Sequence, residues 1–246
     1  MALSTGTAHA ELISVDPGKT LGAGKPITGS GQNFPSLNAT EYWNIGSYPA
    51  PLVSAYYNAG QASKDQAEVT TAALKWTRSW VKKECGSTKP AKVRACKAAA
   101  VFDVDETLLS NYDWFAKADP QFTYDATGEA AANANCTLPV IEPTRALFNS
   151  LKKLGVTPFI ITGRPESDRA ATASCLAKAG ITGYADLILK PNGNNQTAAV
   201  RKADQRKALI KRGWKIGPSI GDQVSDMSLG SMAHGFLLPN GMYFIP

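Results

Sequence analysis

The chain has 246 residues, 43% of them apolar, which is enough to bury one good-sized core. No apolar run approaches the roughly 18 residues that a membrane-spanning helix needs, so we expect no membrane span. The formal net charge is +6, but the lysines and arginines are dispersed, which argues against a nucleic-acid polymer as partner. A net positive field favours a small anionic substrate, and a homo-oligomer is compatible with this composition.

The first part of the chain, residues 1–48, is rich in Gly, Pro, Ser, Thr and Asn and has little apolar periodicity. We expect an extended or partly disordered arm there. The tripeptide Ala8-His9-Ala10 fits the small-x-small pattern of a secretory cleavage site, although an ordinary polar start to the chain explains it equally well.

Residues 49–97 are expected to form a helical segment that packs on the core. From Ala50 to Glu84 the apolar residues follow a helical period, and one stripe is formed by Val69, Ala73, Trp76 and Trp80. We interpret the two tryptophans as core residues and not as a ligand cage.

Residues 98–246 alternate short apolar runs with amphipathic helices, the pattern of a parallel sheet with crossover helices. The expected strands are Ala99 to Phe102, Val156 to Ile161, Leu187 to Leu189, Ile216 to Ile220, and a final pair, Gly235 to Leu238 and Met242 to Ile245. The expected helices are Thr144 to Leu154, Glu166 to Ala179 and Thr197 to Arg212. This predicts a three-layer, doubly wound, mainly parallel α/β sheet with a short insertion at about 111–139, after its first strand.

Four cysteines lack the paired CxxC spacing of a zinc site, and their even number is compatible with two disulfides. Cys85 and Cys96 flank a short loop, so we favour that pair and, by elimination, Cys136 with Cys175. Four unpaired thiols are the alternative. Disulfides would agree with a secreted or periplasmic location.

Two carboxylates, Asp103 and Asp105, come directly after the first expected strand of the core. Ionised groups at the end of a buried run are costly unless they are paired or bind a metal, so packing explains them poorly. A loop that curls over the strand end would direct both into one site. Asp103 is then suited to attack phosphorus, and Asp105 to protonate the leaving oxygen and later activate water.

Other expected strands also end in polar residues that phosphoryl transfer would use. Thr162, Gly163 and Arg164 offer a hydroxyl, a backbone amide and a guanidinium to phosphate oxygens, and Lys190 offers an ammonium. Each has an ordinary alternative, such as a helix cap or a solvated surface cation. Ligands of parallel sheets bind at the carboxyl ends of strands, so we expect these groups to converge on one crevice.

The strand ending at Ile220 is followed by Asp222 and Asp226. Asp103, Asp222 and the backbone carbonyl of Asp105 would form an oxygen-only site, which suits Mg²⁺. The cation would relieve the repulsion between an attacking carboxylate and a phosphate dianion.

Aromatic residues of the insertion, Tyr112, Trp114 and Phe115, together with Arg164, are candidates for a leaving-group pocket, where rings would suit a nucleobase or an aryl group. Alternatively, these rings anchor the insertion to the core.

The four strand-end motifs, in this order, resemble those of the haloacid dehalogenase (HAD) superfamily of phosphotransferases. Segments 102–111, 162–166 and 238–243 resemble its subgroup of bacterial secreted acid phosphatases and plant vegetative storage proteins. The resemblance implies an aspartyl-phosphate mechanism. It makes Asp103 the nucleophile, Asp105 the acid/base, Thr162 and Lys190 phosphate ligands, and Asp222 a magnesium ligand supported by Asp226, with Thr107 orienting the loop or Asp105.

We therefore expect a Mg²⁺-dependent acid phosphatase acting on phosphate monoesters, with Asp103 ionised, Asp105 protonated and an acidic pH optimum. Two alternatives use the same fold. One is a non-catalytic storage or phosphate-binding protein, which the presence of Asp103 disfavours. The other is a phosphotransferase that passes the phosphoryl group to an alcohol.

Overall fold

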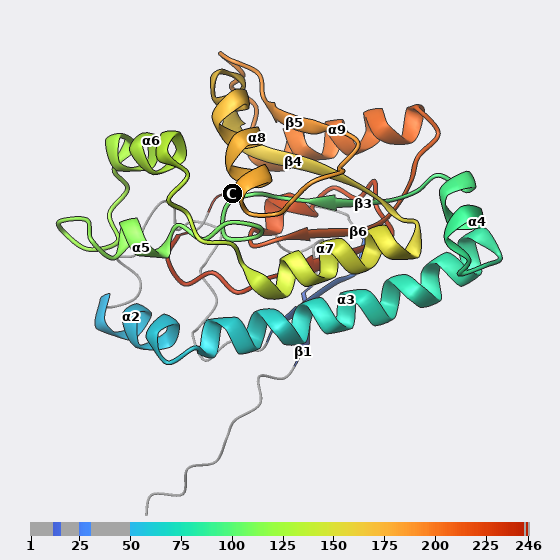
Figure 1. The fold of residues 1–246 in the computed structure, drawn as a ribbon, viewed down its shortest axis with the longest axis horizontal. Helices are drawn as coiled ribbons and strands as arrows, with labels where there is room; N and C mark the ends of the chain where they lie inside the picture. Colours follow the sequence, from blue (N-terminus) through green and yellow to red (C-terminus); the bar gives the residue numbers. More distant parts are fainter. Residues whose placement is uncertain (1–11, 16–24, 31–49, 244, 246) are drawn as a thin grey trace, which may run out of the picture.

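The computed structural model describes residues 12–15, 25–30, 50–243 and 245. Its strands form one twisted sheet, and its helices pack around that sheet (Figure 1). The strands are β1 (Leu12–Val15), β2 (Ile27–Ser30), β3 (Ala98–Phe102), β4 (Thr157–Pro165), β5 (Leu187–Lys190), β6 (Lys215–Gly221) and β7 (His234–Leu237). The helices are α2 (Ala50–Asn58), α3 (Gln61–Cys85), α4 (Pro90–Ala95), α5 (Tyr112–Phe115), α6 (Ala126–Asn135), α7 (Glu142–Leu154), α8 (Arg169–Lys178) and α9 (Ala198–Lys211), with short 3-10 turns η2 (Glu166–Asp168) and η3 (Val224–Asp226).

The strands lie in the order β1-β2-β7-β6-β3-β4-β5. The pairings from β2 to β5 are all parallel, and β1 adds an antiparallel edge. The strand order reverses beside β3, which pairs with β6 on one side and β4 on the other. Such a switch point opens a crevice at the carboxyl ends of the strands.

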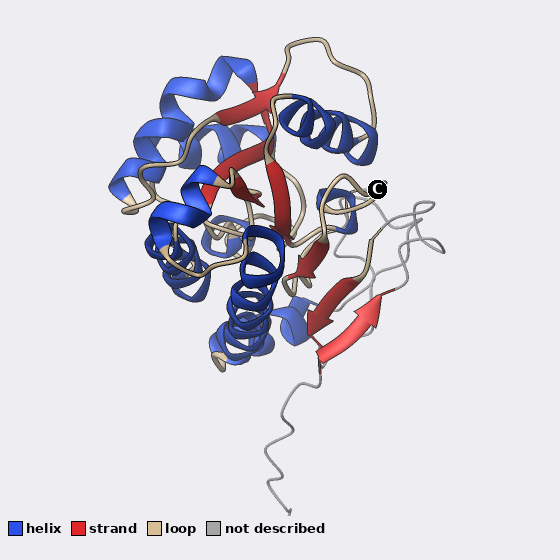
Figure 2. Ribbon diagram, turned by 90° about the vertical axis from the view of Figure 1, so that its right-hand side faces the viewer, coloured by secondary structure: helices blue, strands red, loops and turns tan. Residues whose placement is uncertain are grey.

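Helices cover both faces of this sheet (Figure 2). In β3, Ala98, Ala100 and Phe102 pack into the hydrophobic core shared with α3, α7 and α8, whereas Ala99 and Val101 face the core that includes Leu209 of α9. This period of two, with every residue of β3 buried, is what a central parallel strand requires. The predicted three-layer, mainly parallel α/β fold is confirmed.

The second strand of the predicted final pair, Met242 to Ile245, is wrong for the residues described there, because none of Met242, Tyr243 and Ile245 is in a strand. Their backbone N–H groups donate instead to side-chain oxygens, those of Met242 and Tyr243 to Asn240 Oδ1 and that of Ile245 to Gln223 Oε1. The sequence pattern did not reveal that side chains would replace a strand partner.

The segment expected to be an N-terminal arm contributes β1 and β2 to the sheet edge, where β2 pairs with β7. The remainder of 1–48, including Ala8-His9-Ala10, lies outside the described residues. The helical segment behind it runs along the molecule: α3 packs beside α7 (Figure 1). Trp76 of α3 is partly buried and packs against Phe236 at the edge of the core.

A second, smaller core joins α2 to the insertion. It contains Val53 and Tyr56 of α2, Phe115 and Phe122 of the insertion, and Tyr243. Because Phe115 and Tyr243 also line the cavity described below, α2 supports its wall from behind.

Both favoured disulfides are present in the structure: Cys85 pairs with Cys96, and Cys136 with Cys175. The second one ties the end of α6 in the insertion to α8 in the core. Among the described residues, no helix combines the length and the apolar character that crossing a membrane would take.

Candidate active site

A cavity of about 490 Å³ opens at the carboxyl ends of β3, β4, β5 and β6. Its floor includes Asp103, Asp105 and Asp222, and residues of the insertion and of α9 form its walls. Residues at the ends of these four strands therefore lie together in one crevice, as expected.

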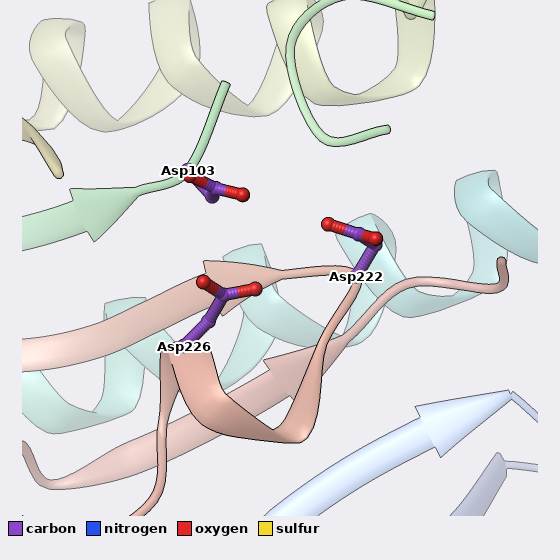
Figure 3. A group of neighbouring side chains, drawn as sticks. All are labelled: Asp103, Asp222 and Asp226. Atoms are coloured by element: carbon purple, nitrogen blue, oxygen red, sulfur yellow. The ribbon is translucent and has the colours of Figure 1, made fainter. Parts of the chain in front are cut away.

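Three carboxylates point toward one another at this floor (Figure 3). Asp103, Asp222 and Asp226 each offer an oxygen within 4.8 Å of the others, and all three are buried. Asp103 continues the line of β3, because its backbone N–H donates to Ile220 O of β6 at 3.0 Å. Asp222 and Asp226 follow β6 directly, so the central strand pair brings the three together.

The absence of a side chain at Gly221 allows Asp226 to come this close. A Cβ at Gly221 would lie 2.1 Å from Asp226 Oδ2 and 2.4 Å from its Cβ, which no real contact permits. The carboxylate of Asp226 accepts a hydrogen bond from Gln223 N at 2.9 Å and so closes the turn after β6. Glycine is thus required here for close approach.

Two basic residues of α9 enter the same cluster. Lys202 is 5% exposed; its Nζ lies 3.0 Å from Asp103 Oδ1 and also contacts Asp226. Arg201 is buried beside it and donates to the backbone carbonyl of Thr162 at 3.0 Å. Neither residue was predicted from the strand-end motifs, and the ammonium that contacts Asp103 is that of Lys202 and not of Lys190.

A signal for Lys202 does exist in the sequence. Ala199, Lys202, Ala203, Arg206 and Leu209 recur at helical spacing, and all five are buried. Lys202 is identified when these cations are taken as part of the inward face of the helix.

The carboxylate cluster is suited to a divalent cation. Burial and the neighbouring charge of Asp226 raise the pKa of Asp103 to about 7, although Lys202 opposes the shift. Burial, with Asp226 and Asp103, raises the pKa of Asp222 well above its usual range. Asp103 Oδ1 is buried, and its described contact is the ammonium of Lys202 at 3.0 Å. Three oxygen donors that repel one another suit a hard divalent cation, which prefers oxygen ligands.

Asp105 is held differently. Arg164 donates to it through Nε at 3.0 Å and Nη2 at 2.6 Å, and Asn111 Nδ2 donates at 3.0 Å. Burial alone would raise the pKa of Asp105, but the charge and hydrogen bonds of Arg164 outweigh it, so the pKa is lowered. Arg164 is itself 3% exposed, and its guanidinium binds Asp105 in this structure.

The two carboxyls differ in the direction opposite to the one expected from the sequence. Arg164 lowers the pKa of Asp105, whereas burial and Asp226 raise the pKa of Asp103. The reason is the pairing of Asp105 with a cation from β4, 59 residues away in the chain.

The loop after β3 curls back as expected, and both Asp103 and Asp105 line the cavity. Glu106 has the left-handed φ of 51° and is fully buried. Its carboxylate accepts from the backbone N–H of Asn111, and burial raises its pKa to about 8. Thr107 Oγ1 donates to Asp222 Oδ1 at 3.4 Å, and no hydrogen bond joins it to Asp105 among those described.

The other expected site residues divide into two groups. Gly163 and Lys190 line the cavity, as do Trp114 and Phe115. Thr162 is fully buried, and its hydroxyl accepts from Arg164 N at 3.2 Å. Tyr112 is not in the described lining.

Tyr112, for which the sequence suggested a substrate-binding role, contacts α2 instead of bordering the cavity. Its ring stacks on Tyr57 with centroids 4.5 Å apart, and its hydroxyl donates to Asn58 at 3.0 Å, which joins the insertion to α2. Tyr124 and Glu129 of the insertion line the cavity in its place, and Tyr124 donates to Glu129 at 2.8 Å.

Known proteins are similar to this chain in fold or in sequence. Class C acid phosphatase from Bacillus anthracis has a similar fold, with a TM-score of 0.63 over 82% of this chain and 86% of that one, at 18% identity. Vegetative storage protein 1 from Arabidopsis thaliana is 34% identical over 148 residues, and acid phosphatase 1 from Solanum lycopersicum 35% over 150. Each match covers 59% of this chain, and 55% and 58% of those relatives.

The aligned regions thus span less than two thirds of either relative. The family described as HAD superfamily, subfamily IIIB (acid phosphatase), in contrast, matches residues 38–246, which include β3 to β7, every residue of the carboxylate cluster and Lys202. The chain belongs to the acid phosphatase subfamily IIIB of the HAD superfamily.

Proposed function

We propose that this chain is a Mg²⁺-dependent acid phosphatase that hydrolyses phosphate monoesters through an aspartyl-phosphate on Asp103. One observation carries the proposal: Asp103 lies at the floor of a cavity among two further buried carboxylates and the ammonium of Lys202. A packing role would not explain so many buried charges at strand ends.

In the first half of the reaction, a carboxylate oxygen of Asp103 attacks phosphorus and the bond from phosphorus to the leaving oxygen breaks. Asp105 gives its proton to that oxygen. Lys202, 3.0 Å from Asp103, balances charge on the attacking carboxylate and the transferred group. Arg201 and the backbone of Gly163 border the same space and are available to phosphate oxygens.

In the second half, water attacks the phosphorus and Asp105 accepts a water proton, which frees phosphate and regenerates Asp103. The pairing with Arg164 favours the deprotonated form of Asp105, which is the form that can accept this proton. The same pairing moves the protonation of Asp105 to lower pH. Because the first half of the reaction needs protonated Asp105, this supports an acidic optimum.

Asp103, Asp222 and Asp226, with the backbone carbonyl of Asp105, would hold Mg²⁺. When bound, the cation supplies charge that lowers the repulsion between Asp103 and a phosphate dianion. Lys202 already contacts Asp103 and Asp226, so it completes the neutralisation from the side of α9.

The cavity walls favour a leaving group with an apolar ring. Trp114 and Phe115 line one side, with their rings stacked 3.9 Å apart, and Tyr243 contributes from the C-terminal segment. Aromatic or nucleoside phosphomonoesters fit such a lining. The two disulfides support a secreted or periplasmic location.

The storage proteins among the relatives favour a second candidate, a non-catalytic protein of the same fold. A p-nitrophenyl phosphate assay with Mg²⁺ or with EDTA separates the two. We expect turnover at acidic pH that EDTA abolishes and Mg²⁺ restores. Added glycerol would reveal a phosphotransferase through glycerol phosphate among the products.

Asp103→Asn is the decisive variant, because it keeps the shape of the side chain and removes the nucleophile. We expect turnover to fall by at least about a thousandfold, and ³²P labelling of acid-quenched protein to disappear. Asp204→Asn, on the exposed face of α9, is the matched control and should behave as wild type. Substantial activity in Asp103→Asn would overturn the mechanism.

A further inference from the structure

A turn that follows β7 lies behind the carboxylate cluster. Leu238 N donates to Gly221 O at 2.8 Å, so the chain leaving β7 is still tied to the end of β6, one residue before Asp222. Two residues later, Asn240 Nδ2 donates to Asp222 Oδ2 at 2.8 Å. Asn240 is 8% exposed and is absent from the described lining of the cavity, so it faces the metal ligand and not the substrate space.

A second amide converges on the same oxygen. Gln223 Nε2 donates to Asp222 Oδ2 at 2.6 Å. A carboxylate oxygen offers about two lone-pair sites, so these two donors occupy Oδ2 and leave Oδ1 to face a cation. The described contact to Oδ1 is the long one from Thr107, at 3.4 Å.

Backbone donors fix which end of each amide faces Asp222. Asn240 Oδ1 accepts from Met242 N at 2.8 Å, and Gln223 Oε1 accepts from Ile245 N at 2.8 Å. A backbone N–H can only donate, so the oxygen of each amide must face it and the NH₂ group must face Asp222. The C-terminal segment thus sets the orientation of both donors.

Neutral donors have a chemical advantage at this position. The guanidinium on Asp105 and the ammonium on Asp226 neutralise the carboxylates that they hold. The amides orient Asp222 and leave its negative charge for a cation. Partners of this kind tune metal affinity by fixing the ligand before the metal arrives.

We infer that Asn240 is a positioning residue: through its Nδ2 group, with Gln223, it holds Asp222 with Oδ1 turned to the metal site. The inference rests on the proposed metal-dependent function. It gives the Leu238-Pro239-Asn240 segment, which sequence analysis singled out only as a resemblance, a role in cation binding.

The test compares two substitutions that distinguish the contact of Asn240 with Met242 N from its contact with Asp222. In Asn240→Ser the hydroxyl can still accept from Met242 N but is too short to reach Asp222, whereas Asn240→Ala loses both contacts. Asn135→Ser is the matched control, because Asn135 is exposed on α6 and donates to Ala131 O. The Mg²⁺ Kd of each folded protein is measured by titration calorimetry, and its Tm in EDTA.

We expect Asn240→Ser and Asn240→Ala to raise the Mg²⁺ Kd alike, by about 10- to 100-fold. The Tm in EDTA should be lower in Asn240→Ala than in Asn240→Ser, because only the alanine variant loses the contact with Met242 N. The control should keep the wild-type Kd. A wild-type Kd in Asn240→Ser would overturn the positioning role while leaving the proposed function intact. A wild-type protein that binds no Mg²⁺ would overturn both.

Discussion

Two loops bring carboxylates to the cavity, and they hold them by different chemistry. In the loop after β3, Asp105 is paired with Arg164, which lowers its pKa. In the loop after β6, Asp222 is held by the neutral amides of Gln223 and Asn240, and burial with nearby charges raises its pKa. The charge of Asp105 is thus balanced by the protein, whereas that of Asp222 is not.

This difference matches the two tasks of a metal-assisted phosphatase. A carboxylate that exchanges protons depends on its pKa, and a fixed guanidinium lowers that pKa. A carboxylate that binds a cation needs its charge preserved and its geometry fixed, and amides supply both. Lys202 lies between the loops, since it contacts Asp103 of one and Asp226 of the other.

The largest expected effect comes from removing the cation that joins the two loops. Lys202→Met leaves Asp103 and Asp226 buried without their ammonium, so we expect kcat to fall by about 10²- to 10³-fold. Lys190→Met is the matched control, because Lys190 lines the same cavity and is half-buried at the end of β5. Steady-state kinetics at saturating Mg²⁺ measure both.

We expect Lys190→Met to lose less than tenfold. An equal loss in the two variants would mean that Lys190 also meets the phosphoryl group, as the sequence analysis proposed. A larger loss in Lys190→Met would reverse the assignment of the two lysines.

The difference between these lysines shows which site residues can be predicted from the sequence. Four carboxylates of the site follow strands: Asp103, Asp105, Asp222 and Asp226. Because the carboxyl ends of parallel strands lie at one edge of a sheet, the strand periodicity was enough to predict that they lie close together. Lys202 reaches the cluster from within a helix, and its burial depends on the packing of α9 against the sheet. Strand-end reasoning cannot find such a residue.

Contacts between distant side chains were equally hidden. The pairing of Arg164 with Asp105 joins two strand ends, and nothing in either motif says that this arginine would bind a carboxylate in place of phosphate. The loss of the last predicted strand has the same origin, because Asn240 and Gln223 take its backbone donors. Fold class and disulfide pairs, by contrast, were accessible from periodicity and spacing.

A smaller effect is expected from crowding the loop after β6. Gly221→Ala would place a Cβ 2.1 Å from Asp226 Oδ2, so the turn must shift. We expect the free energy of unfolding to fall by about 1–3 kcal/mol, measured in urea, together with weaker Mg²⁺ binding. Gly29→Ala is the control, because its new Cβ meets Leu237 at an ordinary 3.5 Å.

Wild-type stability and Mg²⁺ affinity in Gly221→Ala would show that the turn tolerates displacement. That result would make close approach of Asp226 to the end of β6 dispensable, and the loop after β6 would then be no more constrained than the sheet edge at Gly29.

The smallest expected effect is a displacement of the pH profile through the loop after β3. Arg164→Gln removes the charge that lowers the pKa of Asp105, so that pKa rises. The protonated form of Asp105, which donates to the leaving oxygen, then persists to higher pH, and the alkaline limb of kcat/KM moves upward by about one pH unit.

Arg169→Gln is measured alongside, because Arg169 pairs with exposed Glu166 and the titration of the substrate is common to both variants. Its limb should coincide with that of the wild type. If Arg164→Gln lowered kcat/KM uniformly without moving the limb, Arg164 would act on substrate or loop geometry instead of on Asp105. The distinction between a carboxylate balanced by a cation and one held by amides would then have no catalytic consequence.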